Sequence, residues 1–122
     1  MKKLIFALAL LIPTEASAAT WRKAVESKDG RSTGWVDVSS IRSTSDGNKT
    51  SWVRLNLARG AWATIFIGVR CDSKSYLEGK IVFYEPDGSS NNLTAEEPKW
   101  KLATPDSMME GIVDMVCDDS SY

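Results

Sequence analysis

The stretch of sequence that decides the fold is KTSWVRLNLARGAWATIFIGVRCDSKSYLEGKIVFY, residues 49–84. It contains three runs rich in β-branched and aromatic residues, with short segments of turn-forming residues between them. The runs are Lys49–Leu57, Ala61–Cys71 and Ser75–Tyr84. Because the connecting segments are short, the three runs predict antiparallel strands joined by hairpins.

The lengths of the two loops predict how the three strands are aligned. If Ala58–Gly60 is a three-residue hairpin loop, Trp52 lies opposite Phe66. If Asp72–Lys74 is the next loop, Phe66 lies opposite Lys80. Side chains alternate between the two faces of a strand, so these two registers divide the side chains of all three strands into two sets.

One predicted face is apolar and forms a core, and the other carries aromatic and basic residues. The apolar set is Val53, Leu55, Leu57, Ala63, Ile65, Ile67, Val69, Cys71, Leu77, Gly79, Ile81 and Phe83. The candidate binding residues on the other face are Trp52, Arg54, Trp62, Phe66, Arg70, Tyr76, Lys80 and Tyr84. Tryptophan, tyrosine and arginine are enriched at recognition surfaces, which makes the second face the main candidate for function.

The residue types leave three uses of the aromatic face open. It can bind a partner or form a dimer contact. It can serve only as cross-strand stabilisation, through a Trp52–Phe66 pair and a Phe66–Lys80 contact. It can also be covered by the N-terminal strand or by Glu85–Lys99, a segment with several turn-forming residues that reads as a long surface excursion.

A helix near the C-terminus is predicted to cover the apolar face. Thr104-Pro105 fits an N-cap followed by proline at the first helical position. The apolar residues that follow recur with helical spacing: Met109, Ile112, Val113, Val116 and Cys117. Gly79, which the predicted register places opposite Ile67, leaves room for the helix to approach closely.

The two cysteines, Cys71 and Cys117, lie on the apolar face of the predicted sheet and on the apolar stripe of the predicted helix. In an exported chain, a lone pair of cysteines predicts a disulfide. Closing the long loop between them contributes about 4 kcal/mol on the chain-entropy estimate. The disulfide is therefore expected to tie the helix to the sheet.

Further short strands are expected on both sides of the central three. They are Thr20–Glu26, Thr33–Val38 and a short strand that begins at Trp100. Asp-Gly pairs at 29–30, 46–47 and 87–88 mark turns. The predicted fold class is therefore α+β: a twisted antiparallel sheet of about six strands, with one C-terminal helix packed on one face.

The N-terminus has the pattern of an export signal. Residues 1–18 combine Met1-Lys2-Lys3, an apolar stretch from Leu4 to Ile12 and a small-x-small site, Ala16-Ser17-Ala18. We expect cleavage there, which leaves residues 19–122 as a single domain in the periplasm or secreted. The apolar stretch is too short to span a bilayer, and no cysteine near the cleavage site is available for lipid attachment.

Composition argues against several classes of function. The chain of 122 residues has no histidine, which removes the usual nucleophile–histidine systems and the commonest zinc ligands. We therefore expect no catalytic residues, no metal site and no cofactor. The formal net charge of −1 disfavours binding to nucleic acid.

Several landmarks together resemble the bacterial surface-adhesin protein E family, and they extend over nearly the whole predicted mature chain. They are Trp21, Val36-Asp37-Val38-Ser39-Ser40-Ile41, Arg70-Cys71-Asp72, Tyr76, Trp100, Pro105-Asp106-Ser107 and Val116-Cys117. The resemblance implies the same sheet with a disulfide-tied helix. It also implies adhesion to host extracellular-matrix proteins without enzymatic activity.

The chain departs from the family in having no lipid-attachment cysteine, so a soluble periplasmic role fits it as well as surface adhesion. Pro105-Asp106-Ser107 also replaces the more usual Pro-Gly-Ser. The expected function is binding of a matrix or cell-envelope protein through the aromatic face or the 85–99 loop. The alternative is a periplasmic structural protein that self-associates as a dimer and has no host ligand.

Overall fold

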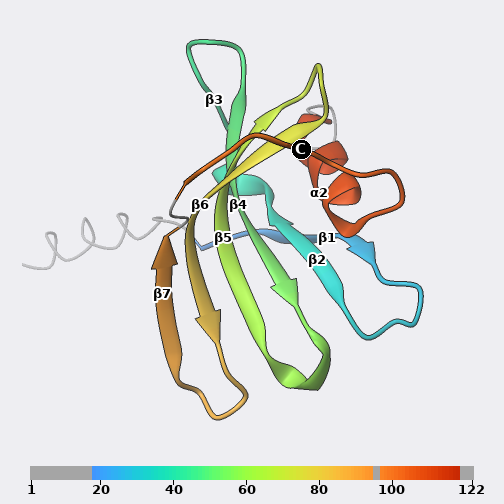
Figure 1. Cartoon of the computed structure of the whole chain (residues 1–122), viewed down its shortest axis with the longest axis vertical. Coiled ribbons are helices and arrows are strands. Elements are labelled where there is room, and N and C mark those ends of the chain that lie inside the picture. Colours follow the sequence, from blue (N-terminus) through green and yellow to red (C-terminus); the bar gives the residue numbers. More distant parts are fainter. Residues whose placement is uncertain (1–17, 95–96, 119–122) are drawn as a thin grey trace, which may run out of the picture.

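The computed structural model describes residues 18–94 and 97–118, and it contains one antiparallel sheet with a helix packed on it. Apart from Ala18, the predicted export signal lies outside the described residues. The main strands are β1 (Trp21–Glu26), β2 (Thr33–Asp37), β4 (Lys49–Asn56), β5 (Trp62–Arg70), β6 (Ser75–Tyr84) and β7 (Ser90–Thr94). They lie in the order β1-β2-β4-β5-β6-β7 (Figure 1).

Shorter elements complete the fold. The strands β3 (Arg42–Ser43) and β8 (Lys101–Leu102) pair with β4 and β6, and the C-terminal helix is α2 (Met108–Cys117). Two 3-10 turns, η2 (Val38–Ser40) and η3 (Ala58–Gly60), follow β2 and β4. No helix among residues 18–94 and 97–118 is long and apolar enough to cross a membrane.

The β4–β5 hairpin has the predicted register. Trp52 lies opposite Phe66, and Leu57 N donates a 2.8 Å hydrogen bond to Ala61 O at the end of the strands. The loop turns because Arg59 and Gly60 adopt positive φ angles of 72° and 83°. Glycine takes this conformation without steric cost.

The predicted β5–β6 register is correct in one half of the hairpin and wrong in the other. Ile65 lies opposite Ile81 as predicted, but Ile67 lies opposite Glu78 rather than Gly79. Between these pairs, Gly79 and Lys80 together oppose the single residue Phe66, which is a β-bulge. A Cβ atom on Gly79 would lie 3.3 Å from the Phe66 carbonyl oxygen, so this position suits glycine.

The bulge changes the face on which one candidate binding residue lies. Beyond the bulge Arg70 pairs with Ser75, so the β5–β6 loop has one residue more than predicted. Lys74, in this loop, adopts a positive φ of 52°. As a result Tyr76 lies opposite Val69 and packs against the core, whereas Leu77 lies opposite Gly68 on the other face. The placement of Tyr76 on the aromatic face and of Leu77 in the core was therefore wrong.

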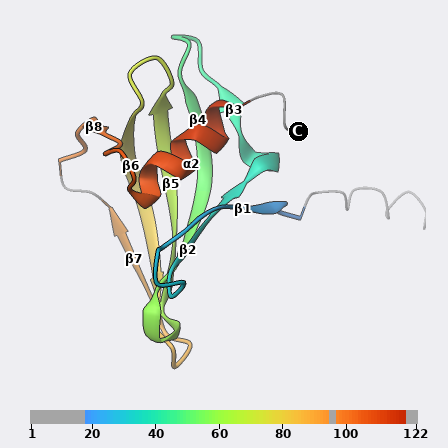
Figure 2. The same cartoon turned by 90° about the vertical axis from the view of Figure 1, so that its right-hand side faces the viewer.

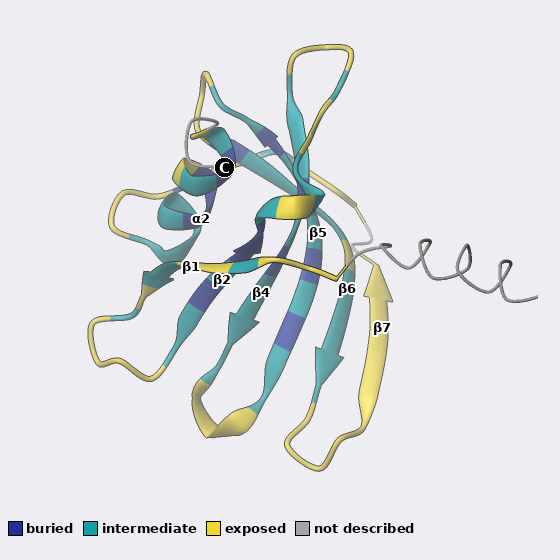
Figure 3. Ribbon diagram, turned by 180° about the vertical axis from the view of Figure 1, so that it is seen from behind, coloured by how far each residue is buried: buried dark blue, intermediate teal, exposed yellow. Residues whose placement is uncertain are grey.

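The helix α2 covers one face of the sheet, which we call the inner face, by packing against β1, β2, β4 and β5 (Figure 2). The apolar stripe of the helix is confirmed, with Ile112, Val113 and Val116 completely buried. The fully or nearly buried hydrophobic residues of the sheet are Val36, Val53, Ala63, Ile65, Ile67 and Val69. Figure 3 shows the buried segments along β2, β4 and β5 in dark blue.

Gly34 and Gly111 allow the helix to approach the sheet closely, a role that we had predicted for Gly79. A Cβ atom on Gly111 of α2 would lie 2.7 Å from Val25 Cβ. A Cβ atom on Gly34 of β2 would lie 2.9 Å from Val25 Cγ1 and 3.0 Å from Ile112 Cδ1. The side chain of Val25 therefore fills the space that both glycines leave between the helix and the sheet.

The helix begins later than predicted, because Ser107 is its N-cap and Thr104 is not. Glu110 N donates to Ser107 Oγ at 3.3 Å, and Asp106 N donates to Glu110 Oε1 at 2.9 Å. Thr104 instead closes a preceding turn, in which its carbonyl accepts hydrogen bonds from Ser107 N and Oγ. That turn requires Asp106 to adopt a φ of 64°, a conformation that aspartate tolerates better than most residues.

The predicted surface excursion, Glu85–Lys99, contains the strand β7, which pairs with β6 along its whole length. Its sequence is polar, and every residue of it is exposed, as the continuous exposed colour of β7 in Figure 3 shows. Residues 95 and 96 of the excursion lie outside the described part of the chain. The predicted strand near Trp100 is confirmed as β8.

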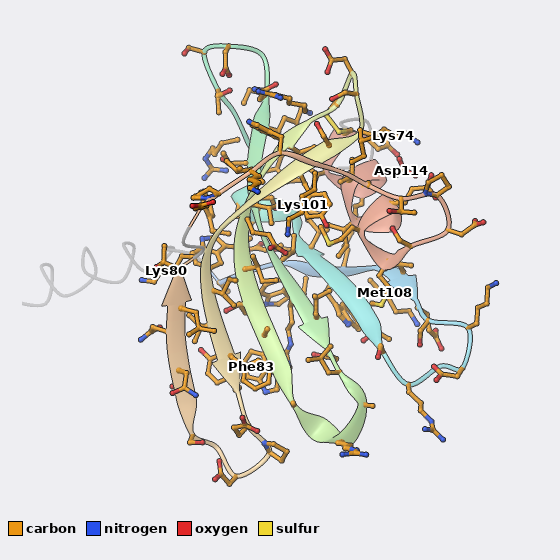
Figure 4. All side chains as sticks on the ribbon, in the orientation of Figure 1. Lys74, Lys80, Phe83, Lys101, Met108 and Asp114 are labelled. Atoms are coloured by element: carbon orange, nitrogen blue, oxygen red, sulfur yellow. A yellow bond between two sulfur atoms is a disulfide. The ribbon has the colours of Figure 1, made fainter. Side chains whose placement is uncertain are left out.

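The predicted disulfide is confirmed between Cys71 and Cys117, with 5.8 Å between their Cα atoms. It joins the end of α2 to the residue that follows β5. Lys74 Nζ lies 2.9 Å from Asp114 Oδ1, so an exposed ion pair also joins the hairpin loop to the helix (Figure 4). Exposed ion pairs contribute little to stability, so the disulfide is the stronger of these two links between the helix and the sheet.

Replacing both Cys71 and Cys117 with serine should lower the free energy of unfolding by about 4 kcal/mol, because the unfolded chain regains the entropy of a 46-residue loop. Urea unfolding with and without a reductant measures this loss. Reductant should destabilise the wild type by a similar amount and leave the variant unchanged. Equal midpoints for the oxidised wild type and the variant would contradict a stabilising role for the disulfide.

All three Asp-Gly pairs form turns that use the aspartate in the same way. Asp29 Oδ1 accepts from Arg31 N and Ser27 Oγ, at 3.0 and 2.7 Å. Asp87 Oδ1 accepts from Ser89 N and Oγ, and Asp46 Oδ1 accepts from Thr44 Oγ1. These hydrogen bonds favour the ionised carboxylate, so the pKa of each of the three aspartates is lowered from 3.8.

Protonating these aspartates should destabilise the fold at acid pH. Because their pKa values are lower in the folded state, their contribution is present above pH 3.8 and is lost as pH falls through the folded values. A triple variant with asparagine at positions 29, 46 and 87 should lose less stability between neutral pH and pH below 3.8 than the wild type does. Urea midpoints at the two pH values test this, and an identical acid loss in both proteins would refute it.

Candidate functional site

The face of the sheet opposite α2, which we call the outer face, carries three groups of aromatic and basic side chains. The first is a stack on β4, β5 and β6. The Trp62 and Tyr84 rings are parallel within 9°, with their centroids 3.8 Å apart, and Arg54 Cζ lies 3.9 Å from the Trp62 ring centroid. Three candidate residues are therefore in direct contact, on neighbouring strands.

The second group is the predicted cross-strand pair of Trp52 and Phe66. Their ring centroids are 5.2 Å apart and their planes are tilted by 56°, which is a favourable aromatic arrangement. Lys80 does not join this pair as its predicted register required, because the bulge displaces the β6 strand at this point. Lys80 instead lies opposite Thr94 of β7, with an exposed side chain.

The third group joins Arg70 to Trp100, a residue that we had not included among the site residues. Arg70 Cζ lies 3.8 Å from the Trp100 ring centroid. A Cβ atom on Gly68 would be 3.6 Å from Trp100 Cη2, so the indole rests on the sheet beside this glycine. Trp100, the residue that follows the predicted excursion, therefore covers one end of the outer face.

A hollow of about 230 Å³ opens beside the first group and is lined by Trp21, Trp35, Arg54 and Asn56. Trp35 lies directly opposite Arg54 in the β2–β4 pairing, so both belong to the outer face. Trp21 pairs with Asp37, two residues beyond Trp35, and therefore shares that face. Of these four residues, only Arg54 is among the candidate binding residues predicted from the sequence.

Asp37 holds the start of β1 in place next to this hollow. This nearly buried carboxylate accepts a 2.9 Å hydrogen bond from Thr20 N and a 2.6 Å bond from Ser39 Oγ. Val38 N also donates to Thr20 O at 2.9 Å. The residue before Trp21 is thus fixed to the end of β2. Asp37 has a positioning role, as a residue that caps the tight turn after β2.

The part of the chain that the structure describes contains no group of three or more acidic, cysteine or histidine residues placed to hold a metal ion. The site offers flat aromatic surfaces and hydrogen-bond donors.

The comparisons with known proteins return no similarity: no family model, no curated protein and no solved structure matches the chain. The resemblance to the surface-adhesin protein E family therefore stays a prediction from the sequence.

The Trp62–Tyr84 stack should stabilise the fold by an energy that a double-mutant cycle can measure. Comparing Trp62→Ala, Tyr84→Ala and the double variant by urea unfolding, we expect a coupling energy of about 0.5–1.5 kcal/mol, the range for paired aromatic rings. The Trp62→Ala and Lys80→Ala pair is the control, because Lys80 makes no ring contact in the described structure. A coupling within error of the control would show that the stack adds nothing to stability.

Proposed function

We propose that this chain is an exported, non-catalytic binding module, and that it binds a protein partner through the outer face. This is the activity that the resemblance to surface-adhesin protein E implies. The partner is a host extracellular-matrix protein or a protein of the cell envelope. The chain acts in the periplasm or after secretion, and the disulfide is consistent with such an oxidising compartment.

The observation that carries this proposal is the Arg54–Trp62–Tyr84 stack on a face that α2 does not cover. All three side chains are only partly buried, so each keeps surface to contact a partner. Their mutual contacts restrict their rotamers before binding, which lowers the entropic cost of forming an interface. Rigid aromatic and arginine side chains near the centre of a patch are typical of binding hot spots.

A second candidate function is self-association as a structural protein, and the edge strand β7 favours it. β7 pairs with β6 on one side, and no other described strand pairs with it. It has neither a charged residue nor a proline to discourage pairing with another chain. An exposed edge of this kind can add a strand from a second copy.

Replacing Trp62 and Phe66 together with alanine should weaken binding to the protein partner at least about thirtyfold, as expected when a hot spot is removed. Surface plasmon resonance on immobilised purified matrix proteins and envelope proteins measures the change. Leu93→Ala is the matched control, because this 52% exposed residue lies on β7 opposite the inner-face residue Ile81. The control variant should bind like the wild type.

Circular dichroism and thiol titration establish that the Trp62 and Phe66 variant is folded and its disulfide intact. Equal binding by the folded variant and the wild type would exclude the outer face as the protein-binding surface. A concentration-dependent dimer mass by light scattering, together with no binding to any tested protein, would favour the self-associating alternative.

A further inference from the structure

The hollow lined by Trp21, Trp35, Arg54 and Asn56 has features that a protein-binding surface does not need. Its lining residues come from β1, β2 and β4, at the end of the outer face away from Trp100. Its volume of about 230 Å³ is below that of pockets for drug-sized ligands, about 300–1,000 Å³. It is large enough for one small ring.

The walls of the hollow are fixed by contacts within the protein. Trp35 Nε1 donates to Thr33 Oγ1 at 2.9 Å, which sets the orientation of this indole. Arg54 Nε donates to Asn56 Oδ1 at 2.8 Å, while the guanidinium rests on the Trp62 ring. A ligand therefore meets a preformed site, which limits the entropic cost of binding.

The polar groups that remain are mostly hydrogen-bond donors. The Arg54–Asn56 bond uses one of the two lone pairs of Asn56 Oδ1 and leaves the NH₂ group of Asn56 available. The terminal nitrogens of Arg54 and the Trp21 indole nitrogen also donate no hydrogen bond within residues 18–94 and 97–118. A matching ligand must therefore present several acceptor oxygens at its edge.

Charge and polarity exclude two other kinds of ligand that aromatic pockets hold. A cationic ligand is disfavoured because Arg54 in the lining is positive, whereas Lys23, opposite Trp35 on the neighbouring strand, is paired with Glu26 at 3.1 Å. A purely hydrocarbon group would leave the desolvated donors of Arg54 and Asn56 without partners, which is costly. The remaining class has a flat apolar face, to lie against an indole, and oxygen atoms around its rim.

We propose that this hollow binds a single sugar ring that carries a carbonyl or carboxylate acceptor, such as an acetamido sugar or a uronic acid. One apolar face of the ring packs on the indoles, and its oxygen substituents accept from Arg54 and Asn56. This inference goes beyond the proposed protein-binding function. It shares only Arg54 with the stack described above.

Titrating the purified chain with oligosaccharides tests the proposal. The probes are an N-acetylglucosamine trisaccharide, a galacturonic acid trisaccharide and maltotriose, each to millimolar concentration. The indole N–H resonances of the five tryptophans report which rings are perturbed. We expect one of the first two probes to shift the Trp21 and Trp35 signals and to bind more tightly than maltotriose, which lacks a carbonyl or carboxylate substituent.

Trp35→Ala should weaken binding of the effective probe about tenfold or more, because it removes a stacking surface. Asn56→Ala should also weaken binding of the probe, because it removes a hydrogen-bond donor while leaving both indoles in place. This second variant tests the hollow even if Trp35→Ala does not fold. Trp100→Ala is the matched control, since it removes an outer-face indole outside the hollow, and it should bind the probe like the wild type.

Three outcomes would overturn the proposal: no perturbation of Trp21 or Trp35 by any probe, equal binding by the Asn56 variant and the wild type, or a preference for maltotriose. If Trp35→Ala abolishes protein binding and no sugar perturbs the hollow, the hollow anchors a side chain of the protein partner instead. Failure of the protein-binding proposal is detected separately, by the Trp62 and Phe66 variant.

Discussion

The structure depends on the strict alternation of side chains along β4 and β5. Along β5 every second residue from Ala63 to Val69 is apolar and buried, and the residues between them are aromatic or small. In β4 the buried residues are Ser51 and Val53, and Trp52 and Arg54 point to the other face. The ten-residue helix α2 covers only the buried face. Ordering so short a helix is unfavourable in isolation, so its packing on the sheet and its disulfide to the end of β5 hold it there. The outer face is then left with aromatic side chains, and α2 does not cover it.

Local spacing predicted much of this fold, and it failed where a single residue changed the alternation. The loop after β4 and the apolar stripe of α2 depend on neighbouring residues, and both were predicted correctly. One extra residue in the β5–β6 loop, compensated by the bulge at Gly79, moved Tyr76 to the inner face. A bulge is decided by how two strands fit in space, and glycine alone does not specify it. β7 was missed because polar, exposed edge strands lack an alternating pattern.

The candidate site was predicted as far as the β4–β5–β6 register reached. Arg54, Trp62 and Tyr84 lie on strands linked by short loops, so their proximity followed from counting residues. Trp21 and Trp35 were missed because β2 pairs with β4 across a connection that contains η2 and β3. No short loop specifies that register. The position of Trp21 further depends on the hydrogen bond from Thr20 N to Asp37 Oδ1, between residues 17 positions apart.

The exposed aromatic residues raise the question of whether they stabilise the sheet or bind a ligand, and the polar groups separate the two roles. In the Trp52–Phe66 and Trp62–Tyr84 pairs the rings contact each other, so each pair stabilises the sheet whether or not it also contacts a partner. In the hollow, by contrast, Arg54 and Asn56 hold each other while their remaining donors point to no described partner. Water can solvate those donors at no cost to the fold, so stability does not require this arrangement. A ligand with matching acceptors does require it, which is why the hollow is the part of the outer face whose chemistry a structural role explains least.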